Sequence, residues 1–261
     1  TTHCGFHRYT FEDLDEARIM IDLTFPAEYS FRVSDAQITR VDEKTIEGFA
    51  TSHTNYGDYT LYFVIQMNKP FKSFNGWSSL HGIQRGIEQI RDSLDIGAFL
   101  TYDTENGEQI LMKTGLSLVD IDGARRNLET ELGNEDWDFD AVVQNAKNEW
   151  NNLLGKIEVE GGTETDKVKF YTNLYRCYAQ KQTWSDVDGR YIDPLERVQQ
   201  LPAGEVMYGG DAFWNTYWNL NGLWSLITPE ITNNWVKTEL ELFDKTGWTN
   251  NGPTGIEHTG V

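Results

Sequence analysis

The stretch FDAVVQNAKNEWNNLLGKI, residues 139–157, separates two kinds of pattern in this 261-residue sequence. Its apolar residues recur at steps of three and four, which places them on one face of a helix: Val142, Val143, Ala146, Trp150, Leu153, Leu154 and Ile157. Asp138 or Asp140 is a candidate N-cap, because a short carboxylate accepts a hydrogen bond from the unpaired N–H groups of a first turn. The stretch therefore predicts an amphipathic helix.

The sequence before this helix, residues 1–118, has the pattern of short strands separated by turns. Six extended runs are predicted as strands: His7–Phe11, Arg18–Leu23, Tyr29–Val33, Ala36–Arg40, Thr45–Ser52 and Thr60–Met67. Asn106–Gly107 lies between two more extended runs and predicts a β-hairpin. Gly82–Leu94 has helix-like spacing, which indicates a helical excursion or a long surface insertion. Many short strands of this kind favour an antiparallel β-sandwich.

The sequence around and after residue 139 predicts helices. A short helix is expected over Asp122–Leu132. Thr163 and Asp166 have the spacing of a capping box and open a helix that runs to about Ala179. Further helices are expected from about Asp211 to Pro229 and over Thr232–Thr246. From residue 138 onward the pattern is all-α, and strands followed by helices without alternation imply separate β and α parts.

Charge and composition exclude several partners. The chain has 41 acidic and 22 basic residues and a formal net charge of −19. Nucleic acids and anionic membranes would be repelled by that charge. No run of 18 apolar residues is present, so no membrane insertion is expected. The two cysteines, Cys4 and Cys177, form one disulfide or none, and the sequence leaves both possibilities open.

The segment YGGDAFWNTYWNLNGLWSLITPE, residues 208–230, is the densest aromatic stretch. Its rings alternate with amide, hydroxyl and carboxylate side chains. Such a mixture suits a sugar, because a ring stacks on the C–H face of the sugar and polar groups take its hydroxyls. The alternative is an ordinary core helix with a few buried asparagines, because aromatic stripes at helical spacing are usually core.

Carboxylates offer the other candidate chemistry, since no nucleophile elbow, P-loop, dinucleotide fingerprint or zinc-protease motif is present. Asp186 and Asp188 in SDVDGRY (185–191) resemble the start of a calcium loop, but a turn in which both bond to backbone N–H groups and to Arg190 is the alternative. A glycosidase needs two carboxyl groups. Glu257 in NNGPTGIEHTG is a candidate, against the alternative of an exposed loop glutamate.

Six segments in their order along the chain resemble glycoside hydrolase family 92: GFHRYTF (5–11), YFVIQMNKPF (62–71), IDGARRNLETEL (121–132), FYTNLYRCY (170–178), SDVDGRY (185–191) and FWNTYWNLNGLWSLITPE (213–230). The resemblance implies an α+β multidomain fold. An antiparallel, supersandwich-like β-sandwich would be followed by a helical linker and the start of an (α/α)6 barrel. The expected boundaries are 1–119 for the sandwich, 120–160 for the linker and 161–261 for the barrel.

The resemblance also implies an activity. Members of this family are mostly calcium-dependent, inverting exo-α-mannosidases, so the expected substrate is an oligosaccharide or glycan, the expected cofactor is Ca²⁺, and the expected location is secreted or periplasmic. Glu257 lies at about the position of the general acid of the family. The catalytic Asp base and most calcium ligands are expected beyond Val261, so that this chain alone would be an inactive internal piece of a longer protein.

The family segment W-D-T, followed by an aromatic and a basic residue, reads here Trp214-Asn215-Thr216-Tyr217-Trp218. Trp214, Asn215 and Trp218 are therefore the expected substrate-binding residues. An amide replaces an acid at Asn215, which loses a charge-assisted hydrogen bond to the sugar. The departure leaves open an altered specificity or a relative that binds carbohydrate without catalysis.

Overall fold

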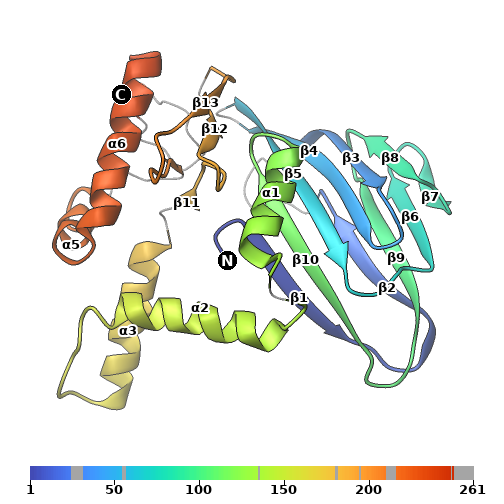
Figure 1. Ribbon diagram of the computed structural model, residues 1–261, viewed down its shortest axis with the longest axis horizontal. Coiled ribbons are helices and arrows are strands. Elements are labelled where there is room, and N and C mark those ends of the chain that lie inside the picture. The colour runs from blue at the N-terminus through green and yellow to red at the C-terminus, as the bar shows by residue number, and fades with distance from the viewer. Residues whose placement is uncertain are drawn as a thin grey trace. The chain divides into compact units, whose positions relative to one another are not determined.

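The structure is a computed structural model that describes residues 1–24, 32–54, 57–134, 136–179, 182–193, 195–209, 216–247 and 249. It divides into two compact units, Thr1–Phe139 and Asp140–Val261. The first unit consists of β-sheets with one helix, and the second contains the remaining helices (Figure 1).

Two antiparallel sheets build the first unit (Figure 1). Sheet A has the strand order β1 (Cys4–Thr10), β10 (Gln109–Ser117), β5 (Gly57–Met67), β4 (Thr45–Thr54), β3 (Arg32–Arg40) and β8 (Gln89–Asp92). Sheet B has the order β2 (Leu14–Asp22), β9 (Gly97–Thr104), β6 (Ser73–Ser78) and β7 (Gly82–Arg85). The predicted antiparallel sandwich is confirmed. Of the predicted strand Tyr29–Val33, only the end lies among the described residues, in β3.

Every second side chain along the strands points into the space between the two sheets, and these side chains form the core. In β2, Ala17 and Ile19 are buried, whereas Arg18 and Met20 point outward. Ile38 and Ile46 of sheet A join the same core. Successive side chains of a strand point to opposite faces, and each large aliphatic side chain removed from water contributes about 1.5–3 kcal/mol. The core of this unit is therefore the pair of inner sheet faces.

The predicted hairpin at Asn106–Gly107 is wrong, although the turn itself exists. Gly107 has the positive φ of +82° that a tight turn requires, and its N–H donates to Phe11 O at 2.8 Å. The flanking strands do not pair with each other, because β9 pairs with β2 and β10 pairs with β1. The turn thus carries the chain from one sheet to the other. A local turn signal cannot reveal this, because the pairing partners lie far away in the chain, in β1 and β5 for β10 and in β2 and β6 for β9.

The helix-like spacing of Gly82–Leu94 is also misleading. This segment forms two short strands, β7 and β8, which belong to different sheets. Ile90 is buried in the sandwich core, whereas Ile83 and Leu94 are 71% and 57% exposed. Apolar residues three or four positions apart therefore do not share one face here, because successive side chains of an extended strand point to opposite sides.

The helix α1 (Ile121–Leu132) packs on the outer face of sheet A, against β10 and β5 (Figure 1). Asp120 caps it, with Oδ1 accepting a hydrogen bond from Gly123 N at 2.6 Å. Leu128 lies so close to Gly115 of β10 that a Cβ there would lie 2.7 Å from the Leu128 Cβ. The missing side chain at Gly115 therefore lets the helix lie directly on the strand.

The start of β1 is tied to α1 by a half-buried ion pair. His3 Nδ1 lies 2.5 Å from Glu131 Oε1, and His3 N donates to Glu131 Oε2 at 3.0 Å. Burial would raise the pKa of Glu131, but hydrogen bonds from His3 and Thr1 outweigh it and hold that pKa at about 2. Burial raises the pKa of the adjacent Cys4 thiol to about 12, so this neighbour stays neutral.

This pair makes the stability of the first unit sensitive to acid. The pKa of Glu131 falls from 4.5 in the unfolded chain to about 2 in the folded one. Its contribution is therefore present above pH 4.5 and is lost as the pH falls toward 2, with an upper limit of about 3 kcal/mol. We expect Glu131→Gln to lower the free energy of unfolding at pH 7 but much less at pH 3. Urea titrations at both pH values measure this.

The matched control is Glu129→Gln, on the exposed side of the same helix. It should change the free energy of unfolding by less than about 0.5 kcal/mol at either pH. An equal loss for Glu131→Gln at pH 7 and pH 3 would show that the carboxylate charge does not stabilise the unit.

The second unit contains the helices α2 (Phe139–Leu154), α3 (Glu164–Tyr178), α5 (Leu220–Ile227) and α6 (Pro229–Thr246), of which α2 starts at the last residue of the first unit. The capping box at the start of α3 is confirmed, since the Thr163 side chain accepts from Asp166 N and the Asp166 side chain accepts from Thr163 N. Pro229 ends one helix and starts the next, because a proline at the first helical position has no N–H to leave unpaired.

The prediction that the chain is all-α from residue 138 onward is wrong between α3 and α5. Two short ribbons lie there, β11 (Gln182–Thr183) with β14 (Tyr208–Gly209), and β12 (Arg190–Ile192) with β13 (Val198–Gln200). Backbone N–H and C=O groups in a long connection need hydrogen-bond partners, and these short ribbons supply them. A strand of two or three residues is too short to show an alternating pattern in the sequence.

The helices of the second unit share a small aromatic core. Leu174, Tyr178 and Trp224 are buried together, and Leu153, Leu154 and Ile157 pack against them. The helix predicted over 139–157 is therefore confirmed, with its apolar end in the core. No described residue of α2 itself is buried, and Trp150 is in ring contact with Tyr175 at 4.5 Å between centroids.

Candidate functional site

The aromatic segment 208–230 falls into three parts in the second unit. Tyr208–Gly209 forms β14, and residues 216–230 contribute Thr216, α5 and the start of α6. Residues 210–215 are outside the described part of the chain, as are residues 250–261. The predicted site residues Trp214, Asn215 and Glu257 therefore lie outside the described residues, and Trp218 is the one predicted site residue whose surroundings the structure describes.

Trp218 and its neighbour Tyr217 are surface rings. Trp218 is 72% exposed and Tyr217 is 52% exposed. Their centroids are 4.8 Å apart with an interplanar angle of 30°. An exposed aromatic pair costs hydrophobic free energy unless something covers it, so it is typical of a binding surface.

Trp224, six residues later, is a core residue. It is 1% exposed and its Nε1 donates to Cys177 O at 3.0 Å. The core-helix alternative therefore holds for Trp224 of α5, whereas Tyr217 and Trp218 before α5 present rings to the surface, and a sugar surface there stays a prediction. Only the structure separates them, since the sequence places both tryptophans in one expected helix from about Asp211 to Pro229.

Two polar atoms beside the exposed rings in the sequence lack partners. Thr216 Oγ1 and Asn221 Oδ1 are buried and have no hydrogen bond within the part of the chain that the structure describes. A buried polar atom without a partner costs about 1–3 kcal/mol, so such atoms usually meet a water, a ligand or another polar group. The sequence shows these residues as polar groups among the rings, but gives no sign that they are unpaired.

The motif SDVDGRY forms a turn, as the second of its two alternatives predicted. Asp188 Oδ1 accepts from Arg190 N at 3.1 Å, and Asp188 Oδ2 accepts from Arg190 Nε at 2.9 Å. Arg190 Nη2 also lies 3.8 Å from Asp186 Oδ2. The Arg190 guanidinium therefore lies beside the carboxylates of Asp186 and Asp188, where a calcium ion would otherwise bind.

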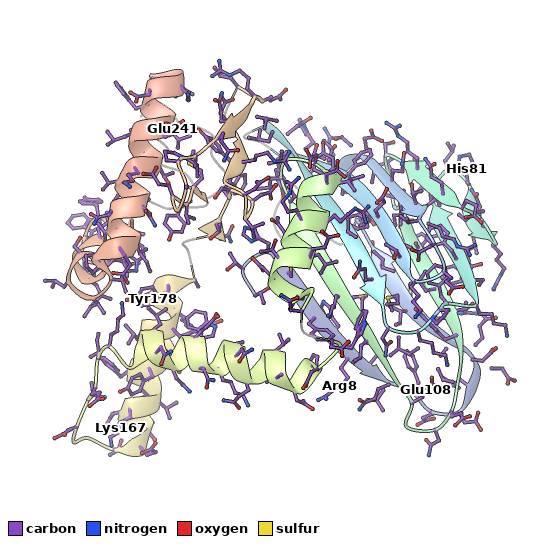
Figure 2. The ribbon with its side chains drawn as sticks, viewed as in Figure 1. Arg8, His81, Glu108, Lys167, Tyr178 and Glu241 are labelled. Atoms are coloured by element: carbon purple, nitrogen blue, oxygen red, sulfur yellow. The ribbon has the colours of Figure 1, made fainter. Side chains whose placement is uncertain are left out.

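This turn is anchored to α6 through Tyr191. The fully buried Tyr191 donates its hydroxyl to Glu241 Oε1 at 2.6 Å, and Figure 2 shows Glu241 on α6. Burial raises the pKa of Tyr191, and the hydrogen bond to Glu241 raises it further. Met207 and Leu201 pack around the same ring with Leu242. The connection that leads into the aromatic segment is thus held rigidly by buried contacts.

Donor side chains that could hold a metal ion do not cluster in the part of the chain that the structure describes. Within residues 1–249, excluding the gaps named above, no group of three or more His, Cys, Asp or Glu side chains could hold a metal ion. The calcium ligands that the family resemblance implies were expected mostly beyond Val261, and the described residues supply no such cluster. Cys4 and Cys177 are both free thiols. No helix in the described ranges is long and apolar enough to span a membrane.

Two family models match the chain in succession. The model described as glycosyl hydrolase family 92 N-terminal domain matches residues 1–117, and the catalytic domain model of the same family matches residues 123–261. The second match covers more than half of the chain.

Solved structures share this fold. The chain resembles a family GH92 α-mannosidase from Bacteroides thetaiotaomicron in complex with mannoimidazole, with a TM-score of 0.85, 22% identity, and coverage of 96% of this chain and 34% of that one. It also resembles a family GH92 inverting mannosidase from the same bacterium, with a TM-score of 0.85, 20% identity, and coverage of 99% and 34%. These likenesses establish the sandwich and helical architecture.

A curated relative is named an uncharacterized secreted glycosidase from Arthroderma benhamiae. It is 29% identical over 93 residues, which are 34% of this chain and 12% of the relative. The chain thus spans about a third of the solved structures and a smaller part of this relative.

Proposed function

The chain belongs to glycosyl hydrolase family 92, and on that premise we propose that the protein is an inverting exo-α-mannosidase that trims terminal sugars from glycans. The observation that carries the proposal is the succession of the N-terminal and catalytic domain matches over 1–117 and 123–261. The structural neighbours are mannosidases, which supports mannose as the sugar, and the exposed Tyr217–Trp218 pair supports a carbohydrate-binding surface. The name of the secreted relative supports secretion.

Glu257 is proposed as the general acid. Its carboxyl group would protonate the leaving glycosidic oxygen while a second carboxylate, an Asp beyond residue 261, activates a water on the opposite face of the sugar. Displacement by that water inverts the anomeric centre. A protonated acid and an ionised base are both needed, so the activity should fall at either extreme of pH.

Trp214, Asn215 and Trp218 are proposed to bind the terminal sugar. An indole stacks on the C–H face of a sugar, and the Asn215 amide both donates to and accepts from hydroxyls. The 72% exposure of Trp218 supports a role at the surface, because the ring is free to meet a ligand. Calcium remains part of the proposal through the family alone, and its ligands would lie outside the described residues.

An assay of the full-length protein on a panel of aryl glycosides, with and without calcium, tests this function. We expect release of mannose from an aryl α-mannoside, with β-mannose as the first product in a proton NMR time course. A chelator should abolish the release and added calcium should restore it, because a family-type calcium site would be emptied and refilled. Release that continues unchanged in excess chelator would remove calcium from the proposal.

Asn215 and Trp218 favour a second candidate, a relative that binds carbohydrate without hydrolysing it. A hydrogen bond to a neutral amide is weaker than one to a carboxylate, by roughly 1 kcal/mol. If this second candidate is right, the full-length protein should bind mannose with measurable affinity but release no sugar from any glycoside in the panel. Turnover in the same assay would exclude it.

A further inference from the structure

A cavity of about 680 Å³ lies on the outer face of sheet A, within the first unit. It is formed by the end of β3, the turn into β4, the end of β5, and Trp137 from the connection between α1 and α2. Gln66 of β5 pairs with Thr45 on the neighbouring strand β4. On its other side it pairs with Lys113 of β10. The volume is within the usual range of small-ligand sites, about 300–1,000 Å³.

Trp137 is held at this cavity in a strained conformation. Its φ is +63° and that of Asp136 is +26°, both in a region that bulky residues rarely adopt. Lys113 Nζ lies 4.7 Å from the Trp137 ring centroid and donates to Leu132 O at 2.7 Å, and Phe6 meets the ring edge-on at 6.0 Å. Strain of this kind persists where surrounding contacts enforce it, and it gathers at ligand sites. The indole is therefore presented in a fixed orientation.

The polar side chains of the cavity are partly free. Asp42 and Arg40 already have partners, since Asp42 Oδ1 accepts from Lys44 N at 2.7 Å in the turn and Arg40 Nη1 donates to Glu88 Oε1, beyond the turn, at 3.1 Å. The side chains of Glu43, Lys44 and Gln66 have no hydrogen bond or ion pair within the described ranges. A carboxylate, an ammonium and an amide thus remain to meet the hydroxyls of a ligand.

The charge of the lining indicates a neutral ligand. The lining contains two basic side chains, Arg40 and Lys44, and two acidic ones, Asp42 and Glu43, so it has no large net charge to attract an ion, although Arg40 also pairs with Glu88 outside the lining. A fixed aromatic ring with free donors and acceptors around it matches a sugar, whose C–H face stacks and whose hydroxyls bond.

We propose that this cavity binds one neutral sugar unit of a glycan, with Trp137 as the stacking ring and Gln66, Glu43 and Lys44 as hydroxyl partners. The ligand class rests on the proposed function. The site binds and performs no chemistry. It would hold a branch of a glycan near the protein and so raise the local concentration of the ends to be trimmed.

Photolabelling of the full-length protein with a diazirine-bearing mannoside tests the site, with mass-spectrometric mapping of the labelled peptides. We expect label on the peptide that contains Trp137, and loss of that label when free mannose competes. Gln66→Ala should weaken the mannose competition at this peptide about fivefold, as expected for one lost neutral hydrogen bond. Gln109→Ala, an exposed glutamine at the start of β10, is the matched control and should change nothing.

Trp137→Gly is the stronger variant, because glycine accepts the positive φ without strain. In this variant, free mannose should no longer reduce the photolabelling of the peptides that contain Gln66 and Lys44. No label at the Trp137 peptide, label that mannose does not displace, or equal competition in wild type and Gln66→Ala would each overturn the inference. Hydrolysis of an aryl α-mannoside by the same preparation separates the two proposals, since turnover without label contradicts only the cavity, and label without turnover contradicts only the enzyme.

Discussion

Replacing Glu257 by glutamine should lower the turnover of an α-mannoside by about 10²- to 10⁴-fold, the range that a general acid contributes. Glutamine keeps the size and the hydrogen-bonding reach of the side chain but has no proton to give to the leaving oxygen. The loss should be larger for substrates with a poor leaving group, such as a disaccharide, than for a 4-nitrophenyl mannoside, whose leaving group needs little protonation. Initial rates on both substrates measure the difference.

Glu160→Gln is the matched control for this variant, because it removes the same charge from an exposed position in the same unit. Its rates should equal those of the wild type on both substrates. Near wild-type rates for Glu257→Gln on the disaccharide would remove Glu257 from the mechanism. An equal loss on the two substrates would give it a role other than acid catalysis.

Replacing Trp224 by alanine should destabilise the second unit by about 3–5 kcal/mol, as expected for a large side chain removed from a packed core. Trp224 is 1% exposed, packs with Leu174 and Tyr178, and donates from Nε1 to Cys177 O at 3.0 Å. The change leaves a cavity between α3 and α5 and an unmet carbonyl at the end of α3. Figure 2 shows Tyr178, which packs against Trp224, on α3.

Trp218→Ala removes the same side chain from the same segment and is the control. Because Trp218 is 72% exposed, its loss should change the free energy of unfolding by less than about 0.5 kcal/mol. Urea unfolding followed by far-ultraviolet circular dichroism compares the two variants. Similar stabilities for Trp224→Ala and Trp218→Ala would contradict the division of the aromatic segment into surface and core. Under the proposed function, Trp218→Ala should instead weaken mannose binding.

The sequence predicts the elements that depend on close neighbours. The capping box of Thr163 and Asp166, the helix over 122–132 and the strand over Ala36–Arg40 need only residues a few positions apart, and all three are confirmed. The resemblance to family 92 rests on segments of the same kind, and the two domain matches confirm it. Glu257, Trp214 and Asn215 lie outside the described residues, so their roles stay predictions.

The sequence-based predictions are wrong where a strand that is distant in the chain determines the structure of a segment. Asn106–Gly107 has the right residues for a hairpin, but β9 and β10 each pair with a strand from the first 22 residues. Gly82–Leu94 has helical spacing, but β3 and β6 offer edges on which its two halves pair as strands. A hydrogen-bonded partner outweighs a weak local preference, because propensities of a few tenths of a kcal/mol per residue are smaller than the ladder and the burial that pairing provides.

By itself, the sequence determined that this protein is a β-sandwich followed by helices, because backbone periodicity and caps act within a turn or a strand. It also determined the family, which the two domain matches confirm. Only the tertiary structure decided which rings face solvent. Trp218 and Trp224 are alike in sequence context, yet α3 covers one and leaves the other exposed. The cavity beside Trp137 is likewise visible only in the tertiary structure, where Lys113 and Phe6, far away in the chain, contact that ring.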